Sequence, residues 1–447
     1  MEFSREQQIA FDKYVSGENI FITGPGGSGK SMLIKKINEH AFSRNKEIHV
    51  CALTGCASIL LNCKAKTLHS WSGVGLANGT IDHLVTKIKK NKFAKTMWKQ
   101  TSILVVDEVS MLSKKLFEAL NAIGKEIRHN SRPFGGIQVI FSGDFYQLPP
   151  VGNDDEPDTQ KFCFESEQWN EIFSKQNQIQ LVKIFRQTDD IYASILNQIR
   201  IGIIKRKTND ILAKQVGRNY SNIEFEPTKL YPTKHRVEQI NNMSMNKLKT
   251  DEKEYVLKYH YDLEMSKNER IIRHGINDKE MQIELDFMAN NLICDKTMKI
   301  KIGAQVMCVI NIKTDAGDIL VCNGSQGIVV GYSEINGCPR VKYNNGIEMV
   351  MERNTWVSDK IPGIGISQVP LILAWALTIH KSQGATLDIA EIDVGSGIFE
   401  CGQTYVALSR VKSLEGLFLT SFDVSKIKIN KKVKMFYDEL DGEDNIL

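Results

Sequence analysis

Residues 19–40 read NIFITGPGGSGKSMLIKKINEH, and this stretch decides how the first part of the chain folds. A short apolar run, typical of a buried strand, is followed by a glycine-rich loop and then by apolar residues at helical spacing. The loop has the pattern GxxxxGK[ST], in which backbone N–H groups and a helix N-terminus bind phosphate. Its residues are Gly24, Pro25, Gly26, Gly27, Ser28, Gly29, Lys30 and Ser31. Because strand, loop and helix follow in this order, the motif predicts a nucleotide site, with Lys30 on the β- and γ-phosphates and Ser31 on Mg²⁺.

Acidic and amide side chains follow two later apolar strands. The run ILVVDE ends in Asp107 and Glu108, and SGDFYQLPPV places Gln147 just after IQVIF. Two carboxylates at the tip of a buried strand are costly unless they have a partner or a function. Beside a phosphate loop, we expect Asp107 to hold Mg²⁺, Glu108 to orient the attacking water and Gln147 to sense the γ-phosphate. Together these motifs predict a nucleoside triphosphatase.

The segments around the motifs alternate between strand-like and helical patterns. The strand-like runs are NIFIT, EIHVCAL, ILVVDE and IQVIFSG. Strands separated by helices predict a parallel sheet with helices on both faces, which is an α/β fold. From about Met243 to Gly365 the pattern changes to short strands punctuated by Gly and Asn, which favours a small β-barrel-like insertion. The α/β pattern resumes at Leu371.

The composition indicates a globular protein of several domains. The 447 residues are 42% hydrophobic and 25% charged, enough to bury large cores. The net charge of +4 is too small to indicate a nucleic-acid binder by itself. Nine cysteines without paired spacing argue against a disulfide framework and a structural metal. With no secretory pattern and no long apolar stretch, we expect a soluble intracellular protein without a membrane partner, its compartment left open.

Two short segments carry groups suited to single-stranded nucleic acid. TGCAS begins at Thr54 and includes Gly55, while TLHSWSG contains His69 and Trp71. Hydroxyls, backbone amides and a large ring can bind a backbone and stack on bases. We therefore predict that these four residues contact DNA. Two alternatives stay open, a structural role for His69 and a place in the core for Trp71.

Further motifs carry a resemblance to a known family. They are IFRQTDD with LNQIRIG, LAWALTIHKSQGATLD with QTYVALSRV, and the segment EVSMLSKKLFEALNAIGKEIR. With these in order, the chain resembles the petite-integration-frequency family of DNA helicases, the RecD-like B subclass of helicase superfamily one. The resemblance runs from the Gln7 region to about Leu419 and is weaker between Lys247 and Leu292.

The resemblance implies an ATP-dependent helicase that translocates 5′ to 3′ on single-stranded DNA and unwinds duplexes, in replication, repair, recombination or telomere and genome maintenance. ATP and Mg²⁺ are the implied cofactors. The implied partners are single-stranded DNA and forked or tailed duplexes, with G-quadruplexes and RNA–DNA hybrids left open. Two alternatives are a RecD-like motor subunit of a recombination or nuclease complex and a DNA-binding scaffold with a vestigial ATPase.

The resemblance also assigns roles at the nucleotide site. Gln7 matches the adenine-contacting glutamine, Arg186 and Arg410 match the two arginine fingers, and Gln383 lies in the motif that couples ATP to DNA. Arginine suits this role because its planar fork binds two phosphate oxygens at once. Both arginines are expected across a cleft from the phosphate loop, so that nucleotide binding closes two domains and hydrolysis opens them.

In the same coupling motif, His380 and Lys381 are expected DNA contacts, although His380 could instead orient the following loop. Trp71 departs from the family, which commonly has a smaller aromatic residue there. Six lysines between Lys87 and Lys99 could belong to a strand-separating wedge or to a solvated helix face.

The implied architecture is two RecA-like P-loop domains with small inserted domains, one of them β-rich and SH3-like. The expected ranges are 1–66 with 100–185 for the first RecA-like domain, 67–99 for a wedge-like insertion, 186–242 with 366–447 for the second RecA-like domain, and 243–365 for the accessory insertion.

Overall fold

The computed structural model divides into two compact units, Met1–Arg218 with Ile392–Leu447 and Asn219–Glu391. The described residues are 3–54, 57–58, 61, 63, 65–75, 77–187, 189–219, 226–266, 269–270, 273–313, 319–321, 323–358 and 361–444. Each unit has its own apolar core. Among the described residues, no helix combines the length and the apolar character that a bilayer span requires. The domain ranges expected from the sequence stay a prediction.

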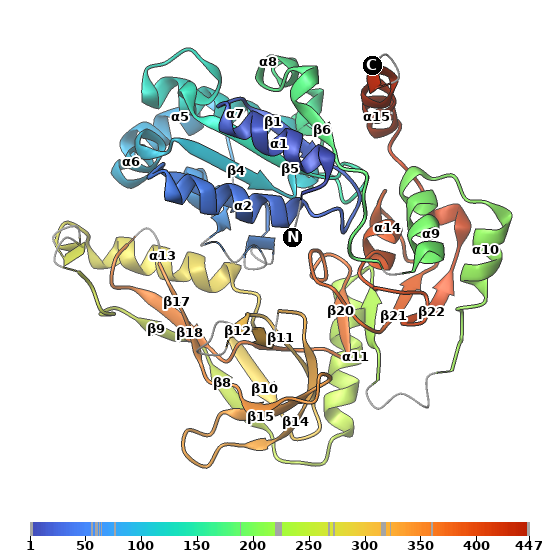
Figure 1. Cartoon of the computed structure of the whole chain (residues 1–447). Coiled ribbons are helices and arrows are strands. Elements are labelled where there is room, and N and C mark those ends of the chain that lie inside the picture. The colour runs from blue at the N-terminus through green and yellow to red at the C-terminus, as the bar shows by residue number, and fades with distance from the viewer. Residues whose placement is uncertain are drawn as a thin grey trace. The chain divides into compact units, whose positions relative to one another are not determined.

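The first unit is built on a six-stranded sheet with the order β3-β2-β4-β5-β1-β6 (Figure 1). All neighbouring strands in it run parallel. The strands are β1 (Ile20–Thr23), β2 (Ile48–Ala52), β3 (Lys66–Thr67), β4 (Ile103–Asp107), β5 (Gln138–Gly143) and β6 (Gln178–Gln180). This parallel sheet flanked by helices confirms the α/β prediction. Because the strands are parallel, the segments that follow β1, β4 and β5 leave from the same edge.

The strands β1, β4 and β5 are buried almost throughout, and the pleat sends alternate side chains to opposite faces. On one face, Ile20 and Ile22 of β1 pack in a cluster with Leu33 and Ile37. The helices of this face are α1 (Arg5–Val15) and α2 (Lys30–Ser43). The apolar positions of these helices recur at helical spacing, so each helix buries one stripe against the sheet.

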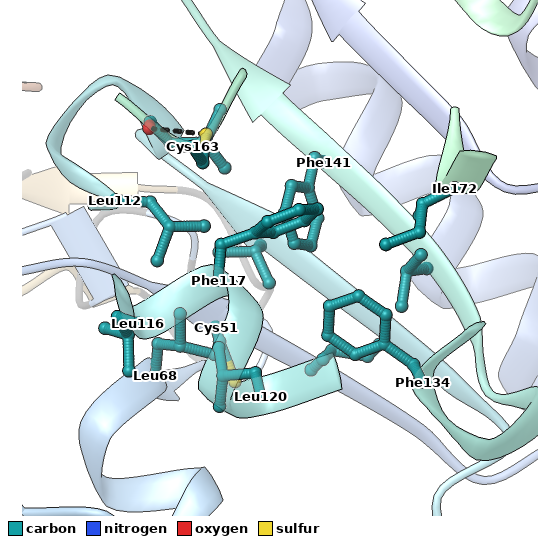
Figure 2. Packing of buried hydrophobic residues seen from close by; sticks show 14 of the residues in the cluster. Cys51, Leu68, Leu112, Leu116, Phe117, Leu120, Phe134, Phe141, Cys163 and Ile172 are labelled. Atoms are coloured by element: carbon teal, nitrogen blue, oxygen red, sulfur yellow. Dashed lines mark hydrogen bonds between the residues drawn. The ribbon is translucent and has the colours of Figure 1, made fainter. Parts of the chain in front are cut away.

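Phe21 points to the second face, where a larger aromatic cluster lies. Figure 2 shows its packing around Phe117, whose ring centroid lies 6.0 Å from that of Phe134 and 5.9 Å from that of Phe141. The helices on this face are α4 (Leu68–Ser72), α5 (Ile81–Lys90), α6 (Lys92–Gln100), α7 (Lys114–Arg128) and α8 (Trp169–Ile172). Short 3₁₀ turns join the elements: η1 (Val109–Met111), η2 (Pro133–Gly136), η3 (Pro157–Thr159), η4 (Cys163–Glu165) and η5 (Lys175–Asn177).

The lysine-rich segment forms the two amphipathic helices α5 and α6. Leu84, Ile88 and Trp98 on their apolar sides belong to the aromatic cluster. On the polar side, Lys89 pairs with Glu126 of α7 over 2.6 Å. A solvated helix face on a packed helix pair therefore describes this segment, and the wedge role stays a prediction.

The chain after β6 adds helices and one complete strand to the first unit. These elements are α9 (Asp190–Ile201), α10 (Arg206–Ala213), α14 (Gln403–Leu408), β22 (Leu417–Phe422), η6 (Val424–Lys426) and α15 (Lys431–Asp444), and β21 (Ala390–Val394) spans the boundary between the units. Val433 and Tyr437 of α15 lie in the same cluster as Phe117. The last helix of the chain is thus part of the core formed around the N-terminal sheet.

Antiparallel strands dominate the second unit (Figure 1). A five-stranded sheet has the order β16-β15-β14-β11-β19, and Val306, Val329 and Val341 lie in its core. The β-rich insertion predicted from the Gly- and Asn-punctuated strands fits this unit. Its elements are β7 (Thr228–Tyr231), α11 (Lys234–Lys247), β8 (Lys253–Val256), β9 (Lys258–His260), α13 (Asp278–Asn291), β10 (Thr297–Ile300), β11 (Gln305–Cys308), β12 (Ile312–Lys313), β13 (Ile319–Val321), β14 (Gln326–Tyr332), β15 (Pro339–Tyr343), β16 (Glu348–Val350), β17 (Asn354–Val357), β18 (Gly365–Gln368), β19 (Leu371–Leu373) and β20 (Ala376–Thr378).

Gly124 in α7 gives a test of the packing on the second face. A Cβ at this position would lie 2.6 Å from the carbonyl carbon and oxygen of Phe134. In an exposed helix, Gly→Ala stabilises by about 0.5–1 kcal/mol. We predict instead that Gly124→Ala lowers the free energy of unfolding by about 1–3 kcal/mol, because the Phe134 backbone must move. Urea unfolding should show this loss, with Lys125→Ala on the same helix within about 0.5 kcal/mol of the wild type. A stabilised Gly124→Ala variant would contradict the packing described here.

Candidate active site

The phosphate loop is a tight turn between β1 and α2. Three of its glycines have positive φ angles, 146° at Gly24, 87° at Gly27 and 84° at Gly29, a region that other residues rarely adopt. Lys30 opens α2, and its Nζ donates to the carbonyl oxygens of Gly24 and Pro25 over 2.6 and 3.0 Å. The loop therefore curls around the Lys30 ammonium group, and the contact of Lys30 with phosphates stays a prediction.

Side chains of neighbouring segments lie very close to the glycines of the phosphate loop. A Cβ on Gly27 would lie 2.5 Å from Arg186 Cβ, and a Cβ on Gly29 would lie 2.5 Å from Gln7 Nε2. The Phe185 N–H donates to the Gly27 carbonyl oxygen over 2.8 Å. Only glycine leaves room for these approaches. The structure thus brings the predicted residues Gln7 and Arg186 to the phosphate loop.

The N-terminal cap of α1 holds Gln7 in place. Ser4 is the cap residue: its Oγ accepts from the Gln7 N–H over 3.3 Å, and its own N–H donates to Gln7 Oε1 over 2.9 Å. The remaining group, Nε2, donates to the Ser28 carbonyl oxygen of the loop over 3.4 Å. The contact with adenine stays a prediction.

The two predicted carboxylates lie where β4 ends. Asp107 is buried, and this burial raises the pKa of its carboxyl group, while the charge of Lys30 opposes the shift. Glu108 has φ 57° and ψ 41°, a left-handed conformation that is strained for a residue other than glycine. The negative charge of Glu108 acts on both Arg186 and Arg410, whose pKa values it raises.

Three carboxylates partly offset the effect of burial on the Lys30 ammonium group. Burial lowers the pKa of its ammonium group, whereas Asp144, Glu108 and Asp107 raise it. The next residue, Ser31, is exposed in the first turn of α2. The arrangement offers a cation, a hydroxyl group and carboxylate oxygens at one edge of the sheet.

The two predicted arginine fingers meet at Ser409. Arg410 is 2% exposed, and its Nε and Nη2 donate to Val406 O and Ser409 Oγ, both over 2.8 Å. Arg186 Nη1 donates to Ser409 O over 3.3 Å. Burial and the charge of Arg186 lower the pKa of Arg410 to about 10, although Glu108 opposes the shift. Arg410 therefore stays protonated at neutral pH.

The segment that carries Arg410 also contacts the phosphate loop. Tyr405 of α14 accepts a hydrogen bond at Oη from the Gly26 N–H over 2.8 Å. The loop and both arginines belong to one compact unit. The expected cleft between the arginines and the loop is therefore not what the structure shows, because Arg186 lies directly against Gly27.

The predicted γ-phosphate sensor, Gln147, lies in the segment that follows β5. Its N–H donates to Asp144 O over 2.9 Å, and its side chain is 5% exposed. Among the described residues, its Oε1 has no hydrogen-bond partner. A buried amide oxygen without a partner is costly. This geometry favours a group that contacts a bound ligand.

A buried ion pair lies beside this segment. Arg200 of α9 donates from Nε to Asp144 Oδ2 and from Nη2 to Asp144 Oδ1, both over 2.9 Å. Its guanidinium lies 4.6 Å from the Tyr146 ring centroid and 5.1 Å from that of Tyr437. Arg200 therefore joins α9 to the end of β5 and differs from the two arginines that meet at Ser409.

The sequence interpretation missed three residues of this site, Phe185, Gln187 and Tyr405. Gln187 is 9% exposed, and both polar atoms of its amide lack partners among the described residues. Its Oε1 lies 3.1 Å from the position of a Cβ on Gly27. The Phe185 ring lies beside Gly29. The motif IFRQ contains Phe185 and Gln187, but only its arginine carries a charge, which indicates binding to phosphate. The role of a ring or an amide depends on burial and neighbours.

Three of the described residues predicted to contact DNA, Thr54, His69 and Trp71, lie in the first unit. His69 lines a cavity of about 400 Å³ together with Leu53 and Lys115. Burial lowers the pKa of His69, so the ring is neutral at pH 7 and offers hydrogen bonds without charge. Thr54 Oγ1 accepts from the Ala57 N–H over 3.2 Å and so closes a local turn. Contact of Thr54 and His69 with DNA stays a prediction.

The structure corrects the prediction that Trp71 stacks on a base. Its side chain is 2% exposed and its ring centroid lies 4.6 Å from that of Trp98, inside the aromatic cluster. The core alternative fits, because a ring packed in this way is not available to a base. The fourth predicted contact, Gly55, lies outside the described residues.

The coupling motif lies in the second unit, in a turn after β20. The Lys381 N–H donates to Thr378 Oγ1 over 3.1 Å, and the Gln383 N–H donates to the His380 carbonyl oxygen over 3.2 Å. Gln383 is buried. The roles of these residues in DNA contact and in coupling stay predictions.

Two family models match the chain. Residues 2–210 match the model described as PIF1-like helicase, and residues 285–332 match the model of the 2B domain of the DNA helicase Pif1. The first match contains the phosphate loop, both carboxylates and Arg186. The second lies inside the β-rich unit.

Known proteins resemble the chain along nearly its whole length. The ATP-dependent DNA helicase PIF1 of Danio rerio is 34% identical over 99% of this chain, which spans 64% of that protein. The crystal structure of Pif1 helicase from Candida albicans is 33% identical with a TM-score of 0.77, covering 98% of this chain and 100% of that one. The structure of Bacteroides Pif1 bound to ssDNA is 27% identical with a TM-score of 0.68, covering 100% of this chain and 98% of that one.

The Asp144–Arg200 pair gives a stability test. Arg200→Leu should lower the free energy of unfolding by about 3–5 kcal/mol, because it leaves the Asp144 carboxylate buried without its partner. Adding Asp144→Asn should recover part of the loss. The exposed pair of Lys36 with Glu39, 2.7 Å apart, is the control, and Lys36→Ala should cost about 0–1 kcal/mol. Denaturant unfolding measures all variants. A double variant less stable than Arg200→Leu would show that the pair is not the cause.

Proposed function

The chain belongs to the PIF1-like helicase family, and from this membership we propose that it is an ATP-dependent DNA helicase. It hydrolyses ATP on single-stranded DNA, moves 5′ to 3′ and separates the duplex ahead of it. One observation carries the proposal: the phosphate loop, the Asp107 and Glu108 carboxylates and the paired Arg186 and Arg410 are assembled in one compact unit. A binding scaffold has no physical need for this set of charges.

In this proposal the phosphates of ATP lie in the glycine-rich loop. Lys30 exchanges its two carbonyl acceptors for phosphate oxygens, which are the stronger acceptors because they are charged. The adenine lies beside Gly29, which Gln7 Nε2 and the Phe185 ring approach. Gln7 supplies hydrogen bonds and Phe185 an apolar surface.

Ser31 and Asp107 are the residues that would hold Mg²⁺ at this site. Hydroxyl and carboxylate oxygens are hard ligands that suit this ion, which commonly binds through one or two carboxylates plus substrate phosphates. The described residues contain no group of three or more His, Cys, Asp or Glu that could hold a metal. When bound, Mg²⁺ would supply positive charge that offsets the negative charge of the transferring phosphoryl group.

In this proposal, hydrolysis depends on four side chains of the first unit. Glu108 orients the attacking water, and Gln147 contacts the γ-phosphate with its buried amide. Arg186 and Arg410 stabilise the charge that develops in the transition state. Because both guanidinium groups are fixed at Ser409, little side-chain ordering remains when ATP binds.

Single-stranded DNA lies along the cavity that His69 lines in the first unit. Neutral His69 hydrogen-bonds the strand, and Lys115 supplies positive charge in the same cavity. Bacteroides Pif1, a relative solved bound to ssDNA, supports this choice of ligand. Forked and tailed duplexes are the proposed substrates for unwinding, and G-quadruplexes and RNA–DNA hybrids are to be compared with them.

Duplexes with a single-stranded tail test the proposal. With ATP and Mg²⁺, the chain should unwind a 5′-tailed duplex and leave a 3′-tailed one intact.

The Lys30→Ala variant should fold but neither hydrolyse ATP nor unwind these duplexes, because the site loses its main phosphate ligand. Opening of only the 3′-tailed duplex would refute the direction. ATP hydrolysis without unwinding of either duplex would favour a motor subunit that needs partners, and absence of hydrolysis would favour the scaffold.

Variants of Arg410 test whether this residue stabilises the transition state or only the fold. Arg410→Ala should lower DNA-stimulated ATP turnover by about 10³–10⁵-fold, and Arg410→Lys should restore little, because lysine lacks the planar fork. Arg410 is buried, so turnover is referred to the folded fraction measured by thermal melting. Glu108→Gln should bind ATP with near-normal affinity and hydrolyse it slowly. If Arg410→Ala loses rate only in proportion to lost folded protein, the finger role is wrong.

A further inference from the structure

The last helix of the chain reaches the edge of the sheet that carries the phosphate loop. Tyr437 of α15 is 3% exposed, and its hydroxyl group meets three groups there. Tyr437 Oη lies 2.5 Å from Thr23 Oγ1, accepts from the Phe145 N–H over 3.1 Å and donates to Asp144 Oδ1 over 3.3 Å. The sequence motifs of the family gave no reason to connect this helix with the nucleotide site.

The ring of Tyr437 is fixed as firmly as its hydroxyl group. It stacks on Tyr146 with the ring centroids 4.7 Å apart and the planes 12° from parallel. The Arg200 guanidinium lies 5.1 Å from its centroid, within the range of a cation–π contact. Burial raises the pKa of Tyr437, so the hydroxyl group keeps the proton that it donates to Asp144. Tyr437 is therefore the third member of the buried Asp144–Arg200 pair.

The contacts of Tyr437 lie where the neighbouring strands β1 and β5 stop pairing. β1 and β5 are neighbours, and their register ends with Thr23 opposite Gly143. Beyond this point, among the described residues, no strand pairing joins the segment after β1 to the segment after β5. The first segment leads into the phosphate loop at Gly24, and the second leads to Gln147. Tyr437 bonds to both segments at this branching point, to Thr23 on one side and to Asp144 and Phe145 on the other.

We propose that Tyr437 is a positioning residue for ATP hydrolysis, which holds the phosphate loop and the Gln147 segment in fixed relation through its hydroxyl group. This inference rests on the proposed ATPase function. Misplacement by about 1 Å of groups that act on one phosphate can cost about a hundredfold in rate. The Tyr437 hydroxyl group thus affects the rate of ATP hydrolysis without contacting the nucleotide.

Packing of α15 alone does not explain the tyrosine. The neighbouring Phe436 anchors the helix by stacking on Phe164 at 4.6 Å, and Val433 is buried in the same cluster. A buried hydroxyl group costs free energy unless it is hydrogen-bonded. A phenylalanine would keep the stacking on Tyr146 and lose only the three polar contacts.

Tyr437→Phe therefore isolates the hydroxyl group. DNA-stimulated ATP turnover at saturating ATP should fall about 10- to 100-fold, while KM for ATP changes little, because the phosphate ligands themselves remain. Phe436→Leu is the matched control on the same helix: it should lower the melting temperature and leave the turnover of folded protein unchanged. Thermal melting of each variant gives the folded fraction.

A double-mutant cycle tests the connection with the phosphate loop. Thr23→Val, which keeps the branched shape, should also lower kcat, and the double variant with Tyr437→Phe should be no slower than the slower single variant. Additive losses in kcat, or a Tyr437→Phe loss that only follows the folded fraction, would overturn the inference and leave a structural tyrosine. A wild-type rate in Tyr437→Phe would overturn the inference alone. A wild-type chain without ATP turnover would overturn the proposed function, and the inference with it.

Discussion

The buried ion pair of Asp144 with Arg200 is the interaction on which the first unit depends. Removing two charges from water costs several kcal/mol per ion, so the remaining bonding positions must be satisfied. Two hydrogen bonds of 2.9 Å, the Tyr146 N–H and the Tyr437 hydroxyl group satisfy them. Because Arg200 lies on α9 and Tyr437 on α15, Asp144 gains both contacts only when both helices lie against the end of β5. One electrostatic constraint thus fixes distant parts of the chain to the edge of the sheet.

Three cationic side chains belong to the site around the phosphate loop. Burial lowers the pKa values of Lys30, Arg186 and Arg410, and the charge of Glu108 opposes this shift in all three. Clustered cations repel one another in a medium of low dielectric constant. A bound triphosphate relieves this repulsion and adds charge-assisted hydrogen bonds. In the proposed function, the electrostatics that disfavour the free site favour the occupied one.

Local patterns made part of this site predictable. Lys30 and Asp107 follow from short motifs at strand ends, and the parallel sheet brings strand ends to one edge whatever the rest of the chain does. Trp71 and Tyr437 could not be assigned in this way. A tryptophan near a polar loop has the same local sequence whether it packs on Trp98 or faces solvent, and only tertiary packing decides between them. Tyr437 reaches the site through contacts with residues about 300 to 400 positions away, which no local spacing encodes.

The backbone conformation of Glu108 depends on the end of strand β4, which comes directly before it. Its left-handed conformation costs about 1–3 kcal/mol and persists only where the surroundings impose it. Asp107 before it is held in the ladder opposite Ala52, and Val109 after it is buried in the aromatic cluster. Glycine would adopt this turn without strain but would carry no carboxylate. With both neighbours fixed, the turn sets the backbone position from which the Glu108 side chain leaves, directly after Asp107. In the proposed mechanism, the residue that orients water and the residue that holds the metal are therefore positioned by the same turn.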